Sequence, residues 1–202
     1  MTVRPARPTD CAAIAALHAD SWRTTYRHIL ASDYLDRQVG DDRLDLWEAR
    51  FAKFDRSLHH IAVSTPDGDA ADATLTGFVC VLLDEEAEYG ALLDNLHVAP
   101  GRHREGIGRR LMADAADWVA TTRPAWSMHL WVYQANARTV GFYRTAGGEE
   151  VDQRVIVTPA GNRAAVLRFQ WRDPRQLAAT LFASFGEAPV AATAAQAAPA
   201  GR

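Results

Sequence analysis

Two glycines and a run of arginines follow an apolar segment near the middle of the chain. Residues 92–98 are apolar enough for a buried strand, and Pro100 ends that strand. Gly106 and Gly108 come next, at the expected start of a helix, with four arginines close by: Arg102, Arg104, Arg109 and Arg110. Glycine lets a backbone approach a ligand closely, and the first N–H groups of a helix have no acceptor within it. The pattern predicts a site for a phosphate-bearing ligand.

The spacing of these glycines excludes the two commonest nucleotide motifs. The dinucleotide fingerprint needs a third glycine where this chain has Leu111, and the P-loop needs Lys and then Ser or Thr after Gly108. What remains, V-x-P-x-x-x-x-x-G-I-G-x-x-L, resembles the acetyl-CoA pyrophosphate loop of the GCN5-related N-acetyltransferases, usually [QR]-x-x-G-x-[GA]. His103 stands where that family has Gln or Arg, so the resemblance assigns diphosphate binding mainly to backbone amides.

A second stretch strengthens the resemblance. Residues 134–148, QANARTVGFYRTAGG, are similar to the family signature N-x-x-A-x-x-F-Y-x-x-x-G-F. Asn136 starts the signature, Tyr143 follows at the family spacing, and Gly148 replaces the final Phe. Each stretch alone also fits an ordinary turn or a capped helix. The two stretches in this order indicate the family far more specifically than either one does.

The resemblance implies direct transfer of an acetyl group from acetyl-CoA, as co-substrate, to a primary amine of a small molecule or protein. Tyr143 would be the general acid for the leaving thiolate. Asn136 would contact the pantetheine arm or a water, and capping of the following helix is its alternative role. No metal is implied. The coenzyme would be bound by Leu96, His97, Val98, His103, Arg104, Glu105, Gly106, Ile107, Gly108, Arg109, Asn136 and Tyr143.

A general base is useful because an amine of pKa about 10.4 is almost fully protonated at pH 7. Asp94 is the first candidate; in a regular strand it shares a face with Leu96 and Val98. Glu88 and His97 are the alternatives, and His97 would point to the opposite face. Asp94 could equally pair with an arginine or cap a loop.

Two aromatic residues, Trp22 and Tyr26, lie in a segment that the resemblance places at the wall of the acceptor pocket. Core packing explains Trp22 as well. Cys80, inside the apolar run FVCVLL, is expected to be a buried small side chain and not a nucleophile.

Composition limits the class of protein. The 202 residues are 48% apolar and 23% charged, which suits one well-buried globular domain. A net charge of −3 gives no reason to expect nucleic-acid binding, and without a run of eighteen apolar residues no membrane span is expected. Two cysteines with no metal spacing and an N-terminus without an apolar signal segment favour the cytoplasm.

The expected elements give an α/β fold of the GNAT type: a mixed, mostly antiparallel central sheet flanked by helices in a single domain. Strands are expected at 2–4, 59–64, 74–83, 89–98, 127–133, 151–157 and 164–171, with helices within 10–54 and at 107–121 and 136–146.

Three regions follow from this order. Residues 1–172 would form the N-acetyltransferase domain, 173–185 an extra helix, and 186–202 an Ala/Pro-rich tail expected to be disordered. The resemblance leaves room for a homodimer. A non-catalytic acyl-CoA-binding or regulatory module of the same fold is the alternative function.

Overall fold

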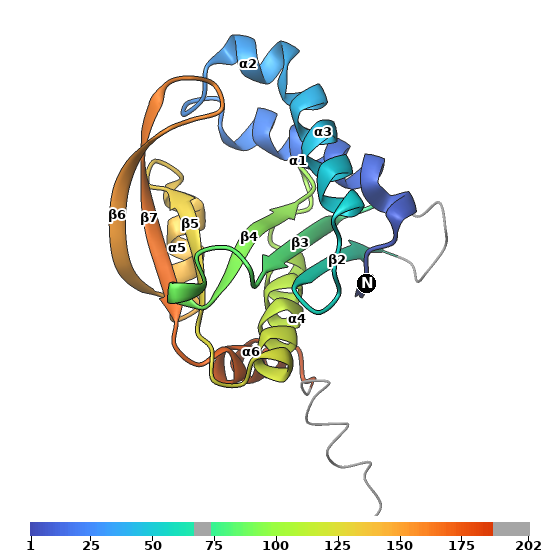
Figure 1. Ribbon diagram of the computed structural model, residues 1–202, viewed down its shortest axis with the longest axis vertical. Coiled ribbons are helices and arrows are strands. Elements are labelled where there is room, and N and C mark those ends of the chain that lie inside the picture. The colour runs from blue at the N-terminus through green and yellow to red at the C-terminus, as the bar shows by residue number, and fades with distance from the viewer. Residues whose placement is uncertain (67–73, 188–202) are drawn as a thin grey trace, which may run out of the picture.

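A seven-stranded sheet runs through the molecule, with helices on both faces (Figure 1). The structure is a computed structural model and describes residues 1–66 and 74–187. All neighbouring strands are antiparallel except β4 and β5, which are parallel, so the predicted mixed sheet is confirmed. In spatial order the strands are β1 (Thr2–Pro5), β2 (His59–Thr65), β3 (Gly77–Leu82), β4 (Ala91–Val98), β5 (Met128–Tyr133), β7 (Arg163–Trp171) and β6 (Glu149–Val157).

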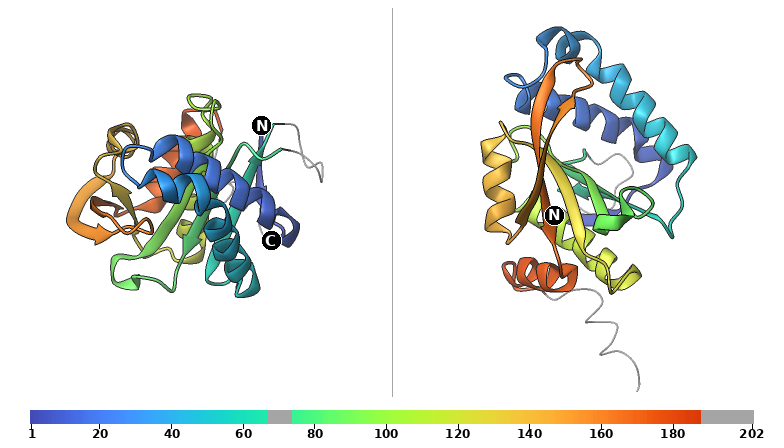
Figure 2. Two further views of the ribbon diagram at one scale, coloured as in Figure 1. Left: turned by 90° about the horizontal axis from the view of Figure 1, so that it is seen from above. Right: turned by 60° about the vertical axis from the view of Figure 1, so that its left-hand side comes forward.

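The helices divide between the two faces of the sheet (Figure 2). One face is covered by α1 (Cys11–Thr25) and α3 (Val39–Ala52), joined by the short α2 (Ser32–Arg37). The other face carries α4 (Ile107–Thr122), α5 (Ala137–Thr145) and α6 (Pro174–Ala183). Two 3-10 turns, η1 (Pro8–Asp10) and η2 (Ala87–Tyr89), complete the order. No helix among the described residues is long and apolar enough to cross a membrane.

Strand β3 shows why the sheet is covered on both sides. All six of its residues are buried, and successive side chains point to opposite faces. Val79 and Val81 enter the core under α4, whereas Phe78, Cys80 and Leu82 enter the core under α1 and α3. An uninterrupted apolar run is typical of a strand buried on both faces.

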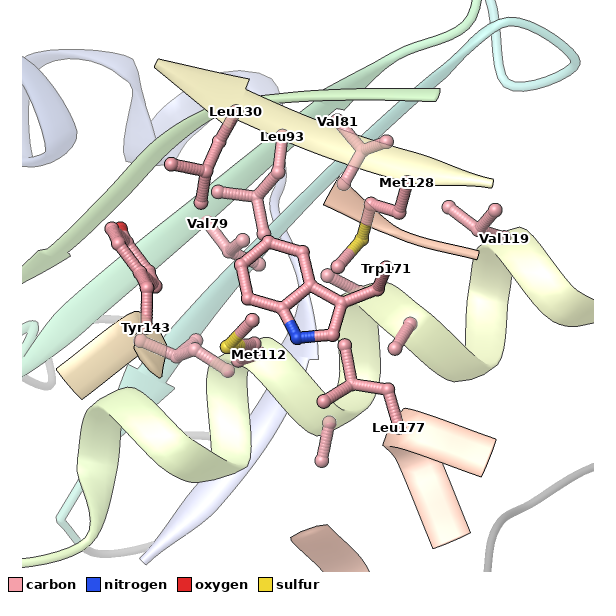
Figure 3. Close-up of a cluster of buried hydrophobic side chains, with 14 of the residues drawn as sticks. Val79, Val81, Leu93, Met112, Val119, Met128, Leu130, Tyr143, Trp171 and Leu177 are labelled. Atoms are coloured by element: carbon pink, nitrogen blue, oxygen red, sulfur yellow. The ribbon is translucent and has the colours of Figure 1, made fainter. Parts of the chain in front are cut away.

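Helix α6, predicted from the stripe at the end of the chain, packs into the same core as α4. Leu177, Ala178 and Leu181 are at most 5% exposed and belong to the apolar cluster that contains Met112 and Trp171 (Figure 3). The helix therefore contributes to the core of the preceding domain. The disorder expected for the Ala/Pro-rich tail concerns residues 188–202 above all, and these lie outside the described residues.

Candidate active site

Strands β4 and β5 separate soon after they meet. Their ladder is limited to two pairs, Ala91 with Met128 and Leu92 with His129. Beyond these pairs, residues of both strands line a cleft of about 1340 Å³. The opening therefore lies at the centre of the sheet, between the helices of the two faces.

The edge of β4 that borders this cleft offers backbone amides. The N–H of Ala99 donates to the carbonyl of Thr76, on the β3 side, at 2.9 Å. Amide directions alternate along a strand, so the N–H groups of Leu96 and Val98 point toward the cleft. An extended ligand can bind there as an added strand would.

The loop before α4 has the backbone geometry of an anion site. Arg104 and Gly106 have φ values of 74° and 81°, in the left-handed region. In the described part of the chain, no backbone hydrogen bond uses the N–H groups of His103, Arg104 and Gly106, and the first N–H groups of α4 have no acceptor inside the helix. Successive free N–H groups at a helix N-terminus attract phosphate oxygens.

Two of the four arginines near this loop are already paired. Arg102 contacts Glu105 at 2.8 Å, and Arg110 contacts Glu187 at 2.6 Å. The guanidinium carbon of Arg110 also lies 4.3 Å from the ring centroid of Phe185. These two cations are therefore less available to phosphates than the sequence predicted.

The remaining arginines face the cleft. Arg104 and Arg109 line it, together with Arg138 of α5, which the sequence analysis did not select. Burial, and then the charge of Arg138, lowers the pKa of His103. The ring of His103 is therefore neutral at pH 7, so the positive charge at this end comes from arginine.

Tyr143 lines the cleft from α5 and is only 5% exposed. Its ring lies 6.0 Å from that of Phe169 and 5.8 Å from that of Trp171, between centroids. Figure 3 shows it at one edge of the apolar cluster, with its hydroxyl pointing away from Trp171. Burial raises the pKa of Tyr143, so the phenol keeps its proton throughout the neutral range.

Asn136 performs the capping role that its position predicted. Its side-chain oxygen accepts a hydrogen bond from the N–H of Thr139 at 3.3 Å, at the start of α5. The residue also lines the cleft, and its side chain partly offsets the rise in the Tyr26 pKa caused by burial. Capping therefore does not remove Asn136 from the cleft.

The expected alternation along β4 is wrong at Asp94. Cys80 pairs with Asn95 and Val81 pairs with Leu93, so Asp94 is an extra residue in a β-bulge. A bulge reverses the side-chain directions that a regular strand would give beyond it.

The consequence is that the two base candidates on β4 share a face. Leu96 and Val98 pack against the α4 core, whereas Asp94 contacts Arg50 of α3 and His97 contacts α1. The regular strand expected from the sequence would instead place Asp94 with Leu96 and Val98, and His97 on the opposite face. Both polar side chains line the cleft from the side of α1 and α3.

Asp94 forms an ion pair with Arg50, as one of its sequence-based alternatives allowed. The side chains are 27% and 19% exposed, and Arg50 also donates to Asn95 Oδ1 at 2.9 Å. Burial opposes the charge of Arg50, but Asp94 outweighs it and the Arg50 pKa is raised. Glu88, exposed on η2, is not among the residues that line the cleft.

His97 is held as a neutral ring. Its Nδ1 lies 2.9 Å from Ser21 Oγ, and its ring stacks on Phe78 at 5.3 Å between centroids. Burial, and then the charge of Arg43, lowers the pKa of His97 to about 3. At pH 7 this side chain carries no charge into the cleft.

The predicted pocket residues Trp22 and Tyr26 both line the cleft, and their rings meet edge to face at 5.4 Å. Trp22 is only 8% exposed, so it serves the core as well. Arg43 and Arg50, both in the cleft lining, were missed by the sequence analysis. Their spacing of seven residues within one helix was the available signal, because it places them on one face.

A splayed parallel strand pair, a helix N-terminus with free amides and a basic rim define an acyl-coenzyme A-dependent transferase. The chain belongs to the acetyltransferase (GNAT) family, whose sequence model matches residues 16–147. It is an N-acetyltransferase. No group of three or more His, Cys, Asp or Glu residues in the described part of the chain is placed to hold a metal.

The chain is similar to the uncharacterized N-acetyltransferase YuaI of Bacillus subtilis (strain 168), with 30% identity over 175 residues, covering 86% of this chain and 94% of that protein. Among solved structures it resembles yncA, a putative acetyltransferase from Salmonella typhimurium with acetyl-CoA, at a TM-score of 0.61 and 22% identity, covering 85% of this chain and 93% of that one. It also resembles paia N-acetyltransferase from Thermoplasma acidophilum in complex with coenzyme A, at a TM-score of 0.60 and 17% identity, covering 84% and 98%. The two structural likenesses concern the fold.

Proposed function

We propose that the enzyme acetylates a primary amine by direct attack on the thioester, with Tyr143 as the general acid. The observation that carries this proposal is the position of the Tyr143 phenol, in the same cleft as the free amides of β4 and of the loop before α4. Residues 103–109 would bind the diphosphate of the coenzyme. Leu96 and Val98 would bind its pantetheine arm through their N–H groups.

In the proposed reaction the amine lone pair forms the new C–N bond and the C–S bond breaks with its electron pair on sulfur. The thiolate then takes the phenolic proton of Tyr143, and the proton that the new amide nitrogen releases returns to the phenolate through water. A β4 amide stabilises the negative charge on the carbonyl oxygen of the tetrahedral state. Cys80 is not proposed to carry the acetyl group, because it is fully buried and burial raises its pKa to about 12.

Asp94 is the proposed base, acting through water on the incoming ammonium. It lines the cleft on the same face as His97 and pairs with Arg50. His97 remains the second candidate, and its low pKa of about 3 makes it a weak proton acceptor in the free enzyme. The cytoplasm is the proposed compartment, in keeping with the unpaired Cys11 and Cys80.

The test measures coenzyme A release from acetyl-CoA with polyamines, amino acids and a lysine peptide. Tyr143→Phe should lower kcat about 10- to 100-fold with little change in the Kd for acetyl-CoA. Tyr89→Phe is the matched control, since Tyr89 is not among the residues lining the cleft. Binding of acetyl-CoA by the wild type without turnover of any amine would instead support the non-catalytic module.

A further inference from the structure

Arginines line the cleft at both of its ends. Among the described residues that line it, six are arginines and Asp94 is the single acidic residue. Four of the arginines lie on the side of α4 and α5: Arg102, Arg104, Arg109 and Arg138. Arg102 is paired with Glu105, and phosphates would neutralise the other three. The other two, Arg43 and Arg50, project from α3 at the end where the acceptor must enter.

These two α3 arginines differ in how well they are satisfied. Arg50 is neutralised by Asp94. Arg43 is 8% exposed; its Nη2 contacts Asp42 at 2.8 Å, but its buried Nε has no hydrogen-bond partner. Asp42 is 40% exposed and also accepts a hydrogen bond from Tyr34. A buried guanidinium with an unused donor is costly unless a ligand supplies the missing acceptor.

Uncharged rings border Arg43 within the cleft. Its guanidinium carbon lies 4.3 Å from the ring centroid of Trp22, which covers one side of the group. On the sheet side it faces His97, which is neutral, and Tyr133, whose pKa is raised by burial despite the charge of Arg43. His97 and Tyr133 belong to the two strands that separate, so Arg43 lies over the opening between β4 and β5.

We infer that Arg43 binds a carboxylate carried by the acceptor, so that the acetylated amine belongs to an amino acid or a similar small aminocarboxylic acid. This inference rests on the proposed function. The planar fork of arginine binds a carboxylate through two parallel hydrogen bonds, and Nε is part of that fork. A polyamine offers no acceptor oxygen to the unpartnered Nε of Arg43, whereas a carboxylate does.

The test compares each L-amino acid with its own carboxamide as acceptor, in the wild type, Arg43→Met and Arg43→Lys. Wild type should show kcat/KM at least about tenfold higher for the best acid than for its amide. Arg43→Met should lower kcat/KM for the acid about 10- to 100-fold, mainly through KM, and leave the amide unchanged. Arg43→Lys, which keeps the charge but loses the fork, should give an intermediate loss.

Arg37→Met is the matched control, because that arginine is 79% exposed on α2. Unchanged acetyl-CoA affinity verifies that each variant is folded. The inference is overturned if the wild type is equally active on acids and amides, or if it is more active on spermidine, on an aminoalkyl phosphonate or on a lysine peptide. It is also overturned if Arg43→Met loses as much activity on the amide as on the acid. In those cases the proposed transfer of an acetyl group to an amine is unaffected. The proposed function fails instead if acetyl-CoA binds but no amine is acetylated.

Discussion

The carboxylate of Asp94 and the guanidinium of Arg50 form an ion pair between β4 and α3, across 44 positions of sequence. The bulge that contains Asp94 turns its side chain toward α3, so the pairing depends on the irregularity of the strand. The proposed base is therefore held in place by a cation. The positive charge of Arg50 therefore weakens the attraction between Asp94 and the ammonium of an acceptor.

The first prediction concerns the stability of this pair. Asp94→Asn and Arg50→Met should each lower the free energy of unfolding by about 1–2 kcal/mol, because either change leaves a partly buried group without its partner. The double variant should lose less than the sum of the two, with a coupling of about 1 kcal/mol in urea denaturation. The exposed pair of Asp33 and Arg37 serves as control and should show no measurable coupling. Equal coupling in the two cycles would contradict the structural role of Asp94.

Much of the fold could be predicted because its strands carry apolar runs and its two motifs mark the ends of β4 and β5. The loop at Gly106 was predictable for the same reason, since a left-handed backbone position selects glycine. The bulge at Asp94 was not, because the adjacent polar residues Asp94 and Asn95 do not show which of them is the inserted one. The side-chain directions beyond it were therefore predicted wrongly.

The acceptor end was less accessible from sequence. The spacing of Arg43 and Arg50 predicts that they lie on one face of a helix. Which strands they face depends on how α3 packs over the sheet. The contribution of α6 to the core was likewise hidden, because a short apolar stripe predicts a helix without naming its partner. In both cases the missing information is tertiary.

The second prediction concerns Gly106, whose φ is 81° at the start of the proposed diphosphate loop. A Cβ there would lie 3.1 Å from Phe185 Cε1, so Gly106→Ala must displace the loop or that ring. We expect a rise of about tenfold in the Kd for acetyl-CoA, measured by calorimetry, because the loop amides lose their alignment. Gly161→Ala is the control: its φ is also 81° and its Cβ would meet open space. It should cost similar backbone strain, about 1 kcal/mol, without changing the Kd.

The third prediction is a pH dependence of stability from His97. Its folded-state pKa of about 3 lies below the ordinary 6.5, so the unfolded chain binds more protons between these values. Its contribution is fully present above pH 6.5 and is lost as the pH falls toward 3. Between pH 7.5 and 5 this amounts to about 1–2 kcal/mol. His97→Gln should reduce the loss of stability over that interval by this amount in urea titrations, whereas the exposed His28→Gln should keep the wild-type slope. An unchanged slope in His97→Gln would show that the ring is protonated in the folded state.

The last prediction asks whether α6 is part of the cooperative core. Leu177 is 4% exposed and lies in the cluster with Met112 and Trp171, so Leu177→Ala removes apolar contacts and leaves a cavity. The expected loss in the free energy of unfolding is about 2–4 kcal/mol, measured by urea denaturation. Leu44→Ala makes the same chemical change on α3 at a side chain of 36% exposure and should cost less than about 1 kcal/mol.

Equal costs for the two variants would mean that α6 detaches before the domain unfolds. A large cost confined to Leu177 would place the end of the folding unit after α6, because a helix that unfolded separately could not transmit the loss to the main transition.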